Sequence, residues 1–364
     1  MIKVLHIVKA LGLGGTEKVM QLMVSGLERS RFTPVVFSLK DGERASRLRQ
    51  AGIETYIEGD LFSDILQIEP DIIHVHRGGW AEGELLRPVI KARKHLEAKR
   101  RSKGCRIPLV ETNVFGRYDA SPQGREIDCT LFVSHFCAER FGRQNNIPLT
   151  SPRWQVLYNP IDFETIARNT IPPEQRDFSH PVAGRISRAD PGKWSELAMT
   201  WLPEVCARKP DFKYQIIGGI EFAEHFVCDH GLGEQVDFLP PFIDDRDLAT
   251  FLNGISIFCH ANDTGESFGL VIAEAMAAGL PVITHPAEGL RDNAQLELVD
   301  HEKTGLIVNN AQEYAAAVLR LLDNPEEARR MGEAGKKKAG REFAQAVIAA
   351  KLEKIYLELL TGNS

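Results

Sequence analysis

No apolar stretch in the sequence is long enough to cross a lipid bilayer. A membrane-spanning helix needs about 20 consecutive, mostly apolar residues, and polar or charged side chains interrupt every hydrophobic run before that length. The N-terminus, Met1-Ile2-Lys3-Val4, also lacks the pattern of a cleavable signal peptide. We therefore expect a protein that is neither secreted nor embedded in the membrane, and we expect it in the cytoplasm.

Cysteine is scarce, and its spacing suits neither crosslinks nor metal binding. The 364 residues contain 6 cysteines, none in a C-x-x-C pair: Cys105, Cys129, Cys137, Cys206, Cys228 and Cys259. A zinc site or a disulfide framework would need closer or paired cysteines. A reducing compartment fits this pattern best.

Internal repeats and low-complexity segments are also missing, and the composition is that of an ordinary globular protein. Hydrophobic residues make up 43% and charged residues 26% of a chain whose length suggests about two domains. The net charge of -6 is unevenly distributed, at +5 for residues 1–168 and -11 for the remainder. The two halves are therefore expected to face different partners.

The first half alternates β-branched strand patterns with helical spacing. Residues 2–8 form the first strand, Gly12-Leu13-Gly14-Gly15 interrupts it, and a helix begins at Thr16. Further strands are predicted at 33–39, 71–76, 107–111 and 129–133, and helices at 81–101 and 136–144. Such alternation predicts an α/β domain with a doubly wound parallel sheet.

A polar, proline-bearing stretch at about 159–178 predicts a linker, after which the alternation begins again. Strands are expected at 181–185, 213–217, 236–239, 255–260, 281–284 and 305–308, and closing helices at 312–322, 326–342 and 344–361. We assign an N-terminal domain to 1–165, a C-terminal domain to 166–343, and a final helix, 344–364, that packs back toward the N-terminal domain. Ligands of such sheets bind at the carboxyl ends of the strands, so two facing sheets predict a central cleft.

The sharpest local feature runs from Gly265 to Val282, where a glycine-flanked turn leads into a helix. Free backbone N–H groups at a helix start suit a phosphate. Glu266 and Glu274 lie in the turn and in the helix, with seven residues between them. On this local pattern alone, two solvated glutamates at a helix start are an open alternative.

Four segments together resemble the retaining glycosyltransferases of family four. Glu266 to Glu274 resembles the E-x7-E motif of that family, and Gly184-Arg185 with Lys193 resembles its G-R-x(n)-K-G donor site. Gly14-Gly15-Thr16-Glu17-Lys18 resembles its glycine loop, and Asn159-Pro160-Ile161-Asp162 its interdomain N-G-I-D element. The pieces occur in the family's order across residues 3–343.

The resemblance implies a GT-B fold, with two Rossmann-like domains that face a central cleft, and a nucleoside diphosphate sugar as donor. It implies that Glu274 binds the ribose hydroxyls, that Glu266 contacts the transferred sugar, and that Arg185 and Lys193 hold the diphosphate. Cationic side chains stabilise the negative charge of a departing diphosphate, so neither a metal nor a cofactor is expected. Further donor contacts are expected at Gly14, Gly15, Arg188, Gly219, Ser267, Phe268, Gly269 and Leu270.

The chain departs from the family at two places. The segment between Arg185 and Lys193 is longer than usual, so Arg188 is an alternative to Lys193. In the N-terminal half the usual histidine after the 107–111 strand is missing, and Asn113 and Arg117 are the candidates for acceptor or sugar contacts. His76, at the end of the 71–76 strand, is the remaining catalytic candidate, expected at the edge of the cleft, while His74 is expected in the core.

Two charged segments allow a second interpretation. Asp245-Arg246-Asp247 has the D-x-D pattern of metal-dependent glycosyltransferases, but its place at a loop-to-helix junction favours helix capping. Residues 87–106 contain nine basic residues and one acid. They predict either a solvated basic helix or contact with an anionic membrane surface, at the inner face of the membrane; nucleic acid is disfavoured.

The sequence thus predicts a retaining, metal-independent hexosyltransferase that acts on a glycan or lipid-linked acceptor in cell-surface polysaccharide or glycolipid assembly. One alternative is a sugar-nucleotide epimerase of the same fold. A dinucleotide-dependent oxidoreductase is another, although Glu17 stands where G-x-G-x-x-G needs its third glycine. A catalytically silent carbohydrate-binding protein is a third. The nucleotide base, the sugar, the acceptor and the oligomeric state stay open.

Overall fold

A computed structural model describes residues 1–100, 106–241, 245–289 and 291–362. The chain divides into two compact units: unit 1 contains residues 1–160 and 345–364, and unit 2 contains residues 161–344. The chain therefore returns to unit 1 for its last helix. Among the described residues, no helix is both long and apolar enough to span a membrane.

Unit 1 contains a seven-stranded sheet in the order β3-β2-β1-β4-β5-β6-β7, with every neighbouring pair parallel. The strands are β1 (Ile2–Val8), β2 (Phe32–Ser38), β3 (Glu54–Ile57), β4 (Ile72–Arg77), β5 (Leu109–Asn113), β6 (Cys129–Phe132) and β7 (Trp154–Val156). The order of the strands reverses between β1 and β4. Loops that follow these two strands flank the position where open α/β sheets bind ligands.

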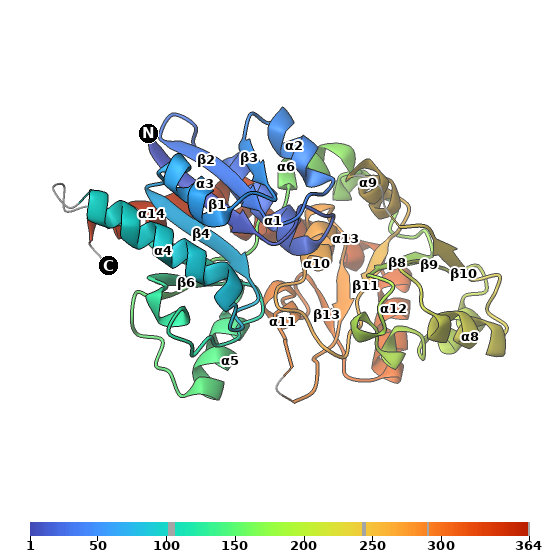
Figure 1. Cartoon of the computed structure of the whole chain (residues 1–364). Coiled ribbons are helices and arrows are strands. Elements are labelled where there is room, and N and C mark those ends of the chain that lie inside the picture. The colour runs from blue at the N-terminus through green and yellow to red at the C-terminus, as the bar shows by residue number, and fades with distance from the viewer. Residues whose placement is uncertain (101–105, 242–244, 290, 363–364) are drawn as a thin grey trace. The chain divides into compact units, whose positions relative to one another are not determined.

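Helices lie around this sheet (Figure 1), and apolar side chains of several of them form a hydrophobic core with its strands. They are α1 (Gly15–Gly26), α2 (Arg44–Gln50), α3 (Leu61–Ile68), α4 (Gly83–Lys99), α5 (His135–Asn145) and α14 (Gln345–Thr361). Ser134 caps α5 by accepting a hydrogen bond from the backbone N–H of Cys137 at 3.1 Å. The terminal helix α14 contacts α1, and it buries Ile348, Leu352 and Tyr356.

Unit 2 contains a six-stranded parallel sheet in the order β10-β9-β8-β11-β12-β13. Its strands are β8 (Val182–Ile186), β9 (Lys213–Ile217), β10 (Val236–Leu239), β11 (Ile257–Cys259), β12 (Val282–Thr284) and β13 (Gly305–Ile307). Its α-helices are α6 (Phe163–Asn169), α7 (Leu202–Arg208), α8 (Glu221–Asp229), α9 (Asp245–Asn253), α10 (Leu270–Ala277), α11 (Gln295–Leu298), α12 (Ala311–Asp323) and α13 (Pro325–Glu342). Here the order reverses between β8 and β11.

The alternation in the sequence predicts 11 of these strands but not β3 and β7. Each of the two is short and lies at an edge of the unit 1 sheet, where fewer apolar side chains are required. The stretch predicted as an interdomain linker, 159–178, contains α6, a helix that the sequence analysis does not predict. Asp162 caps this helix by accepting a hydrogen bond from the Thr165 backbone N–H at 3.1 Å. An Asp at the start of a helical pattern is the signal that reveals this helix.

Candidate active site

The candidate donor site of unit 2 lies where the order of the strands reverses, between β8 and β11. One loop leaves the carboxyl end of β8 and carries Arg188 and Lys193, and another leaves the carboxyl end of β11 and carries Glu266. These two strands are neighbours. The parallel sheet therefore brings together Lys193 and Glu266, which are 73 residues apart in the chain.

Two glycines shape the turn that presents Glu266. Gly265 has φ 67°, and a Cβ atom there would lie 1.4 Å from the backbone oxygen of Asp292. Gly269 has φ 99° and is the N-cap of α10. Both positions require a backbone conformation that glycine adopts readily, and Gly265 also requires the absence of a side chain.

The Glu266 carboxylate accepts hydrogen bonds from three neighbours. Lys193 Nζ lies 3.1 Å from Oε2 and 3.2 Å from Oε1, Asn262 Nδ2 donates to Oε1 at 2.9 Å, and His260 Nε2 lies 3.5 Å from Oε1. Burial opposes the charge, but the contact with His260 and the charge of Lys193 outweigh it and lower the pKa of Glu266 to about 2. Glu266 is thus an ionised carboxylate that is fixed in place.

His260, Asn262 and Gln295 are supporting residues that the sequence analysis does not identify. His260 is buried, which lowers the pKa of its imidazole, and Nδ1 lies 3.0 Å from Thr284 Oγ1. Gln295 Oε1 accepts a hydrogen bond from the Glu266 backbone N–H at 3.1 Å. The available signal for His260 and Asn262 is their position directly after a buried strand, at the carboxyl edge of a parallel sheet.

Arg185 is an interior residue in this structure, with 1% of its surface exposed. Its two terminal nitrogens donate to the backbone oxygens of Ala261 and Lys193, each at 2.7 Å, and its guanidinium lies 4.3 Å from the ring centroid of Trp194. Burial lowers the pKa of Arg185. The side chain therefore ties the Lys193 loop to the end of β11.

The other predicted donor residues of unit 2 differ in burial and in their contacts. Glu274 lies inside α10 and is buried, and Phe268 is buried with its ring edge-on to Phe343 at 5.3 Å. Ser267 Oγ donates to Asp292 Oδ2 at 2.7 Å. Arg188 is exposed, Leu270 is half-buried at the start of α10, and a Cβ on Gly219 would lie 2.5 Å from the Phe238 ring.

The remaining predicted residues belong to unit 1. Gly14 is the N-cap of α1, and Gly15 is its first residue. Asn113 Nδ2 donates to the Arg117 backbone oxygen at 2.8 Å, and the Arg117 backbone N–H donates to Asn113 Oδ1 at 3.2 Å. The Asn113 amide therefore shapes its own loop. His76 is 2% exposed, in contrast to the expected position at an edge, because the rings of His74 and His6 stack against it.

A buried ion cluster at the carboxyl end of β4 also escapes the sequence analysis. Arg77 donates from Nε to Glu111 Oε2 at 2.6 Å and from Nη1 to Asp119 Oδ2 at 3.0 Å. Nη1 also donates to the backbone oxygen of Trp80. Arg77 thereby joins the loops that follow β4 and β5, and its two carboxylate partners explain how a buried guanidinium is tolerated.

Most of the described basic residues within 87–106 are ion-paired inside unit 1. Arg93 contacts Glu97 and Asp128, Lys94 contacts Glu126, Lys99 contacts Glu69, Arg100 contacts Asp71, and Arg106 contacts Asp128. Arg87 and Lys91 stay outside these pairs and lie on the exposed side of α4. Arg101 and Lys103 lie outside the described residues, as does Cys105. The free charge of this helix is thus smaller than its composition suggests.

Asp245 is the first residue of α9, so the D-x-D segment occupies a helix start.

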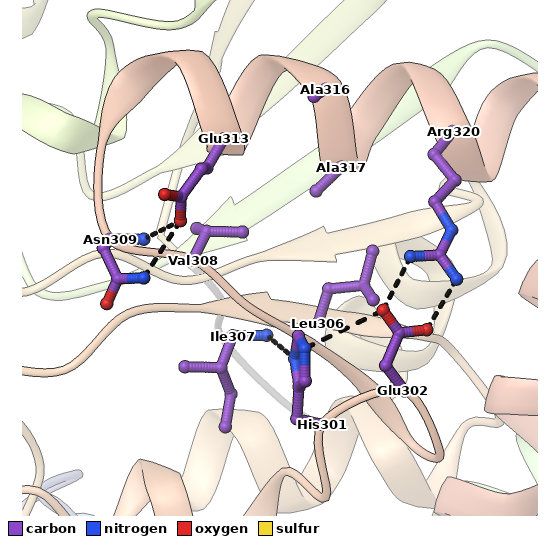
Figure 2. A pocket seen from close by; sticks show the side chains of 10 residues that line it. All are labelled: His301, Glu302, Leu306, Ile307, Val308, Asn309, Glu313, Ala316, Ala317 and Arg320. Carbon is purple, nitrogen blue, oxygen red and sulfur yellow. Dashed lines mark hydrogen bonds and ion pairs between the residues drawn. The ribbon is translucent and has the colours of Figure 1, made fainter.

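A surface pocket of about 340 Å³ lies elsewhere in unit 2, along β13 and α12 (Figure 2). Its polar side chains bind one another: Arg320 contacts Glu302, and Asn309 contacts Glu313. None of the predicted donor residues lines this pocket.

Several known proteins resemble this chain in sequence and in fold. Residues 169–338 match the family described as Glycosyl transferases group 1. The chain is 23% identical to spore coat protein SA of Bacillus subtilis in an alignment of 376 positions, gaps included, that covers 94% of each protein. It is 28% identical to the GDP-mannose-dependent alpha-(1-6)-phosphatidylinositol monomannoside mannosyltransferase of Mycobacterium tuberculosis over 246 residues. This alignment covers 63% of this chain and 61% of that relative, so the chain matches less than two thirds of the relative's length.

Solved structures share the architecture along the whole chain. Anabaena HepE in complex with UDP superposes with a TM-score of 0.75 at 19% identity, over 97% of this chain and 99% of HepE. A glycosyltransferase from Rickettsia africae superposes with a TM-score of 0.77 at 16% identity, over 100% of both chains. The chain therefore has the two-domain GT-B fold of these glycosyltransferases, and its residues 169–338 carry the sequence pattern of the group 1 glycosyl transferases.

Proposed function

We propose that this protein transfers a sugar from a nucleoside diphosphate sugar to an acceptor hydroxyl and retains the anomeric configuration. The observation that carries the proposal is the cluster of Glu266, Lys193, His260 and Asn262 at the point where the unit 2 sheet reverses its strand order. A fixed carboxylate and a cation within 3.1 Å of it suit a ligand that joins hydroxyls to a diphosphate.

In the proposed reaction, the bond between the anomeric carbon and the diphosphate oxygen breaks while the acceptor oxygen bonds to that carbon. The departing phosphate oxygen takes the proton of the acceptor hydroxyl. Lys193, whose side chain is 27% exposed, stabilises the negative charge that develops on the diphosphate. These steps need a fixed positive charge, which the residues of this chain supply, so we propose a reaction without a metal ion.

Arg185 stabilises the negative charge of the diphosphate less directly than Lys193 does. Its terminal nitrogens are held by the Ala261 and Lys193 carbonyls, while Nε is buried without a hydrogen-bond partner among the described residues. We propose that Arg185 fixes the Lys193 loop and adds positive potential beneath the diphosphate. We further propose that Glu274, the fifth residue of α10, binds the ribose hydroxyls. Glu266 then binds hydroxyls of the transferred sugar.

The relatives suggest the class of acceptor. The mannosyltransferase named above acts, by its name, on a phosphatidylinositol monomannoside, which is a lipid-linked glycan. We propose a glycan or lipid-linked acceptor in cell-surface polysaccharide or glycolipid assembly, bound by unit 1, and a protein that works in the cytoplasm at the inner face of the membrane. The exposed Arg87 and Lys91 of α4 are the basic side chains available to an anionic surface.

Release of nucleoside diphosphate from a panel of UDP-, GDP- and ADP-sugars, in the presence of a chelator, tests the proposal. We expect one base to be preferred, and we expect the Lys193→Met variant to lose about 99% of the release or more, by analogy with removal of one charge-stabilising group at about 2.7 kcal/mol or more. Arg208→Met, at the exposed end of α7, is the control. Conversion of the donor into a different nucleotide sugar, without diphosphate release, would identify an epimerase instead.

A further inference from the structure

Three histidines and a tyrosine form a buried cluster in unit 1. His6 lies on β1 opposite His74 on β4, and His76 follows two residues later on the same face of β4. Tyr356 of the terminal helix α14 completes the group. All four side chains are at most 2% exposed.

These side chains form one continuous hydrogen-bonded chain. Thr112 Oγ1 lies 2.8 Å from His74 Nε2, and His74 Nδ1 lies 2.6 Å from the Tyr356 hydroxyl. That hydroxyl lies 3.4 Å from His6 Nε2, and His6 Nδ1 lies 3.0 Å from His76 Nε2. The chain ends at His76 Nδ1, which is buried without a hydrogen-bond partner among the described residues.

The three imidazoles are neutral at physiological pH. Burial lowers the pKa of each ring, to about 3 for His76, and the neighbouring histidines lower the pKa values of His6 and His74 further. A neutral imidazole has one N–H and one bare nitrogen. The chain therefore has two complete arrangements, with all hydrogen bonds pointing in one direction or all in the other.

The two arrangements differ at the free end. If Thr112 donates to His74, every bond runs toward His76, whose Nδ1 then carries an unpaired N–H. If His76 donates from Nε2 to His6, every bond runs toward Thr112, and His76 Nδ1 is a bare acceptor. A buried N–H without an acceptor is rarer in proteins than an acceptor that lacks a donor, so the second arrangement is favoured.

We propose that Tyr356, His6, His74 and Thr112 are positioning residues that hold His76 in the tautomer with a bare Nδ1, which accepts a hydrogen bond from a hydroxyl group of a bound sugar. This inference rests on the function proposed above. His76 is the next-to-last residue of β4, at the strand-order reversal of the unit 1 sheet where ligands of such sheets bind. The terminal helix is thereby part of the site, although it lies 282 residues from His74.

Nitrogen-15 NMR of histidine-labelled full-length protein, without any substrate, tests the tautomer directly. We expect His76 to show a bare Nδ1 and a protonated Nε2. The Tyr356→Phe variant keeps the aromatic ring but lacks the hydroxyl, so His6 and His76 should then populate both tautomers. Thr112→Val should disturb His74 in the same way, and Thr112→Ser, which keeps a hydroxyl, should restore the pattern of the original protein.

Activity provides the second readout. Using the nucleotide sugar from the panel, we expect Tyr356→Phe to lower kcat about tenfold, the loss of roughly one hydrogen bond, with little change in the KM for the donor. Tyr56→Phe, which removes an exposed hydroxyl bonded to Glu54, is the matched control and should change neither. If Tyr356→Phe does not fold, the proposal is tested with Thr112→Val, which should disturb the tautomers, and Thr112→Ser, which should restore them.

Three results would overturn the proposal. The first is a proton on His76 Nδ1 in the original protein. The second is a stoichiometric metal ion bound by the three histidines, measured by elemental analysis of protein purified without a histidine tag, since their nitrogens lie within 4.8 Å of one another. The third is an unchanged tautomer and kcat in the variants. Failure of the proposed function would appear separately, as a correct tautomer in a protein that consumes no nucleotide sugar.

Discussion

Lys193 and Glu266 are 73 residues apart in the chain, and their side chains form an ion pair with Nζ 3.1 Å from Oε2. Each residue lies on a loop that follows one of the two central strands of unit 2, β8 and β11. Arg185 fixes the Lys193 loop through its backbone, and Gln295 and Asn262 fix Glu266. The pair is thus held from both sides before any ligand binds, as a preorganised electrostatic site requires.

The lowered pKa of Glu266 predicts a specific acid dependence of stability. Its pKa is about 2 in the folded protein and 4.5 in a model compound, so the carboxylate contributes stability above about pH 4.5 that is lost as the pH falls toward 2. We expect the Tm difference between the original protein and Glu266→Gln to narrow as the pH is lowered through this range. A difference that stays constant would mean that Glu266 has an ordinary pKa.

Gly265→Ala tests the geometry of the turn. The new Cβ would lie 1.4 Å from the Asp292 carbonyl oxygen, so the backbone must move, and we expect a large fall in Tm together with loss of donor binding. Gly231→Ala is the matched control, since Gly231 has a similar φ of 63° and open space around it. It should cost only the backbone strain of about 1 to 2 kcal/mol. Equal effects of the two substitutions would contradict the described turn.

Removal of the Arg77 side chain leaves two buried carboxylates, those of Glu111 and Asp119, without their cation. Breaking such a buried pair costs about 3 to 5 kcal/mol, so Arg77→Met should sharply lower the stability of unit 1 in urea unfolding. Arg143→Met removes an exposed pair with Glu139 and should cost at most about 1 kcal/mol. A mild effect at Arg77 would show that solvent reaches the cluster.

Contact with an anionic membrane surface should depend on Arg87 and Lys91 of α4, which are exposed and form none of the ion pairs described above. Substitution of Arg87 and Lys91 by Gln should reduce cosedimentation with anionic liposomes, since each basic residue near the surface contributes about 1 kcal/mol. Substitution of Lys94 and Lys99, which are paired with Glu126 and Glu69, should reduce it less. Absence of binding by the original protein would leave α4 as a solvated basic helix.

Much of the fold could be predicted because strands and helices have different hydrophobic periods. Strands such as β9 and β10 are bounded by the residues that the pattern gives, and the glycines around Glu266 indicate the turn. The burial of His76 and Arg185 could not be predicted, since the partners that cover them lie far away in the sequence. The chain from Thr112 to His76 requires β1, β4, β5 and α14 to meet, and no local pattern encodes that contact.

Calorimetric titration of the protein with UDP, GDP, ADP and NAD, without added metal, tests the central claim most directly. We expect one nucleoside diphosphate to bind, and Glu274→Ala to weaken that binding by about 1 to 3 kcal/mol, the cost of leaving the ribose hydroxyls without their carboxylate partner. Glu288→Ala, which alters an exposed side chain, should bind like the original protein. Binding of NAD alone, or of none of the four, would contradict a nucleotide-sugar transferase.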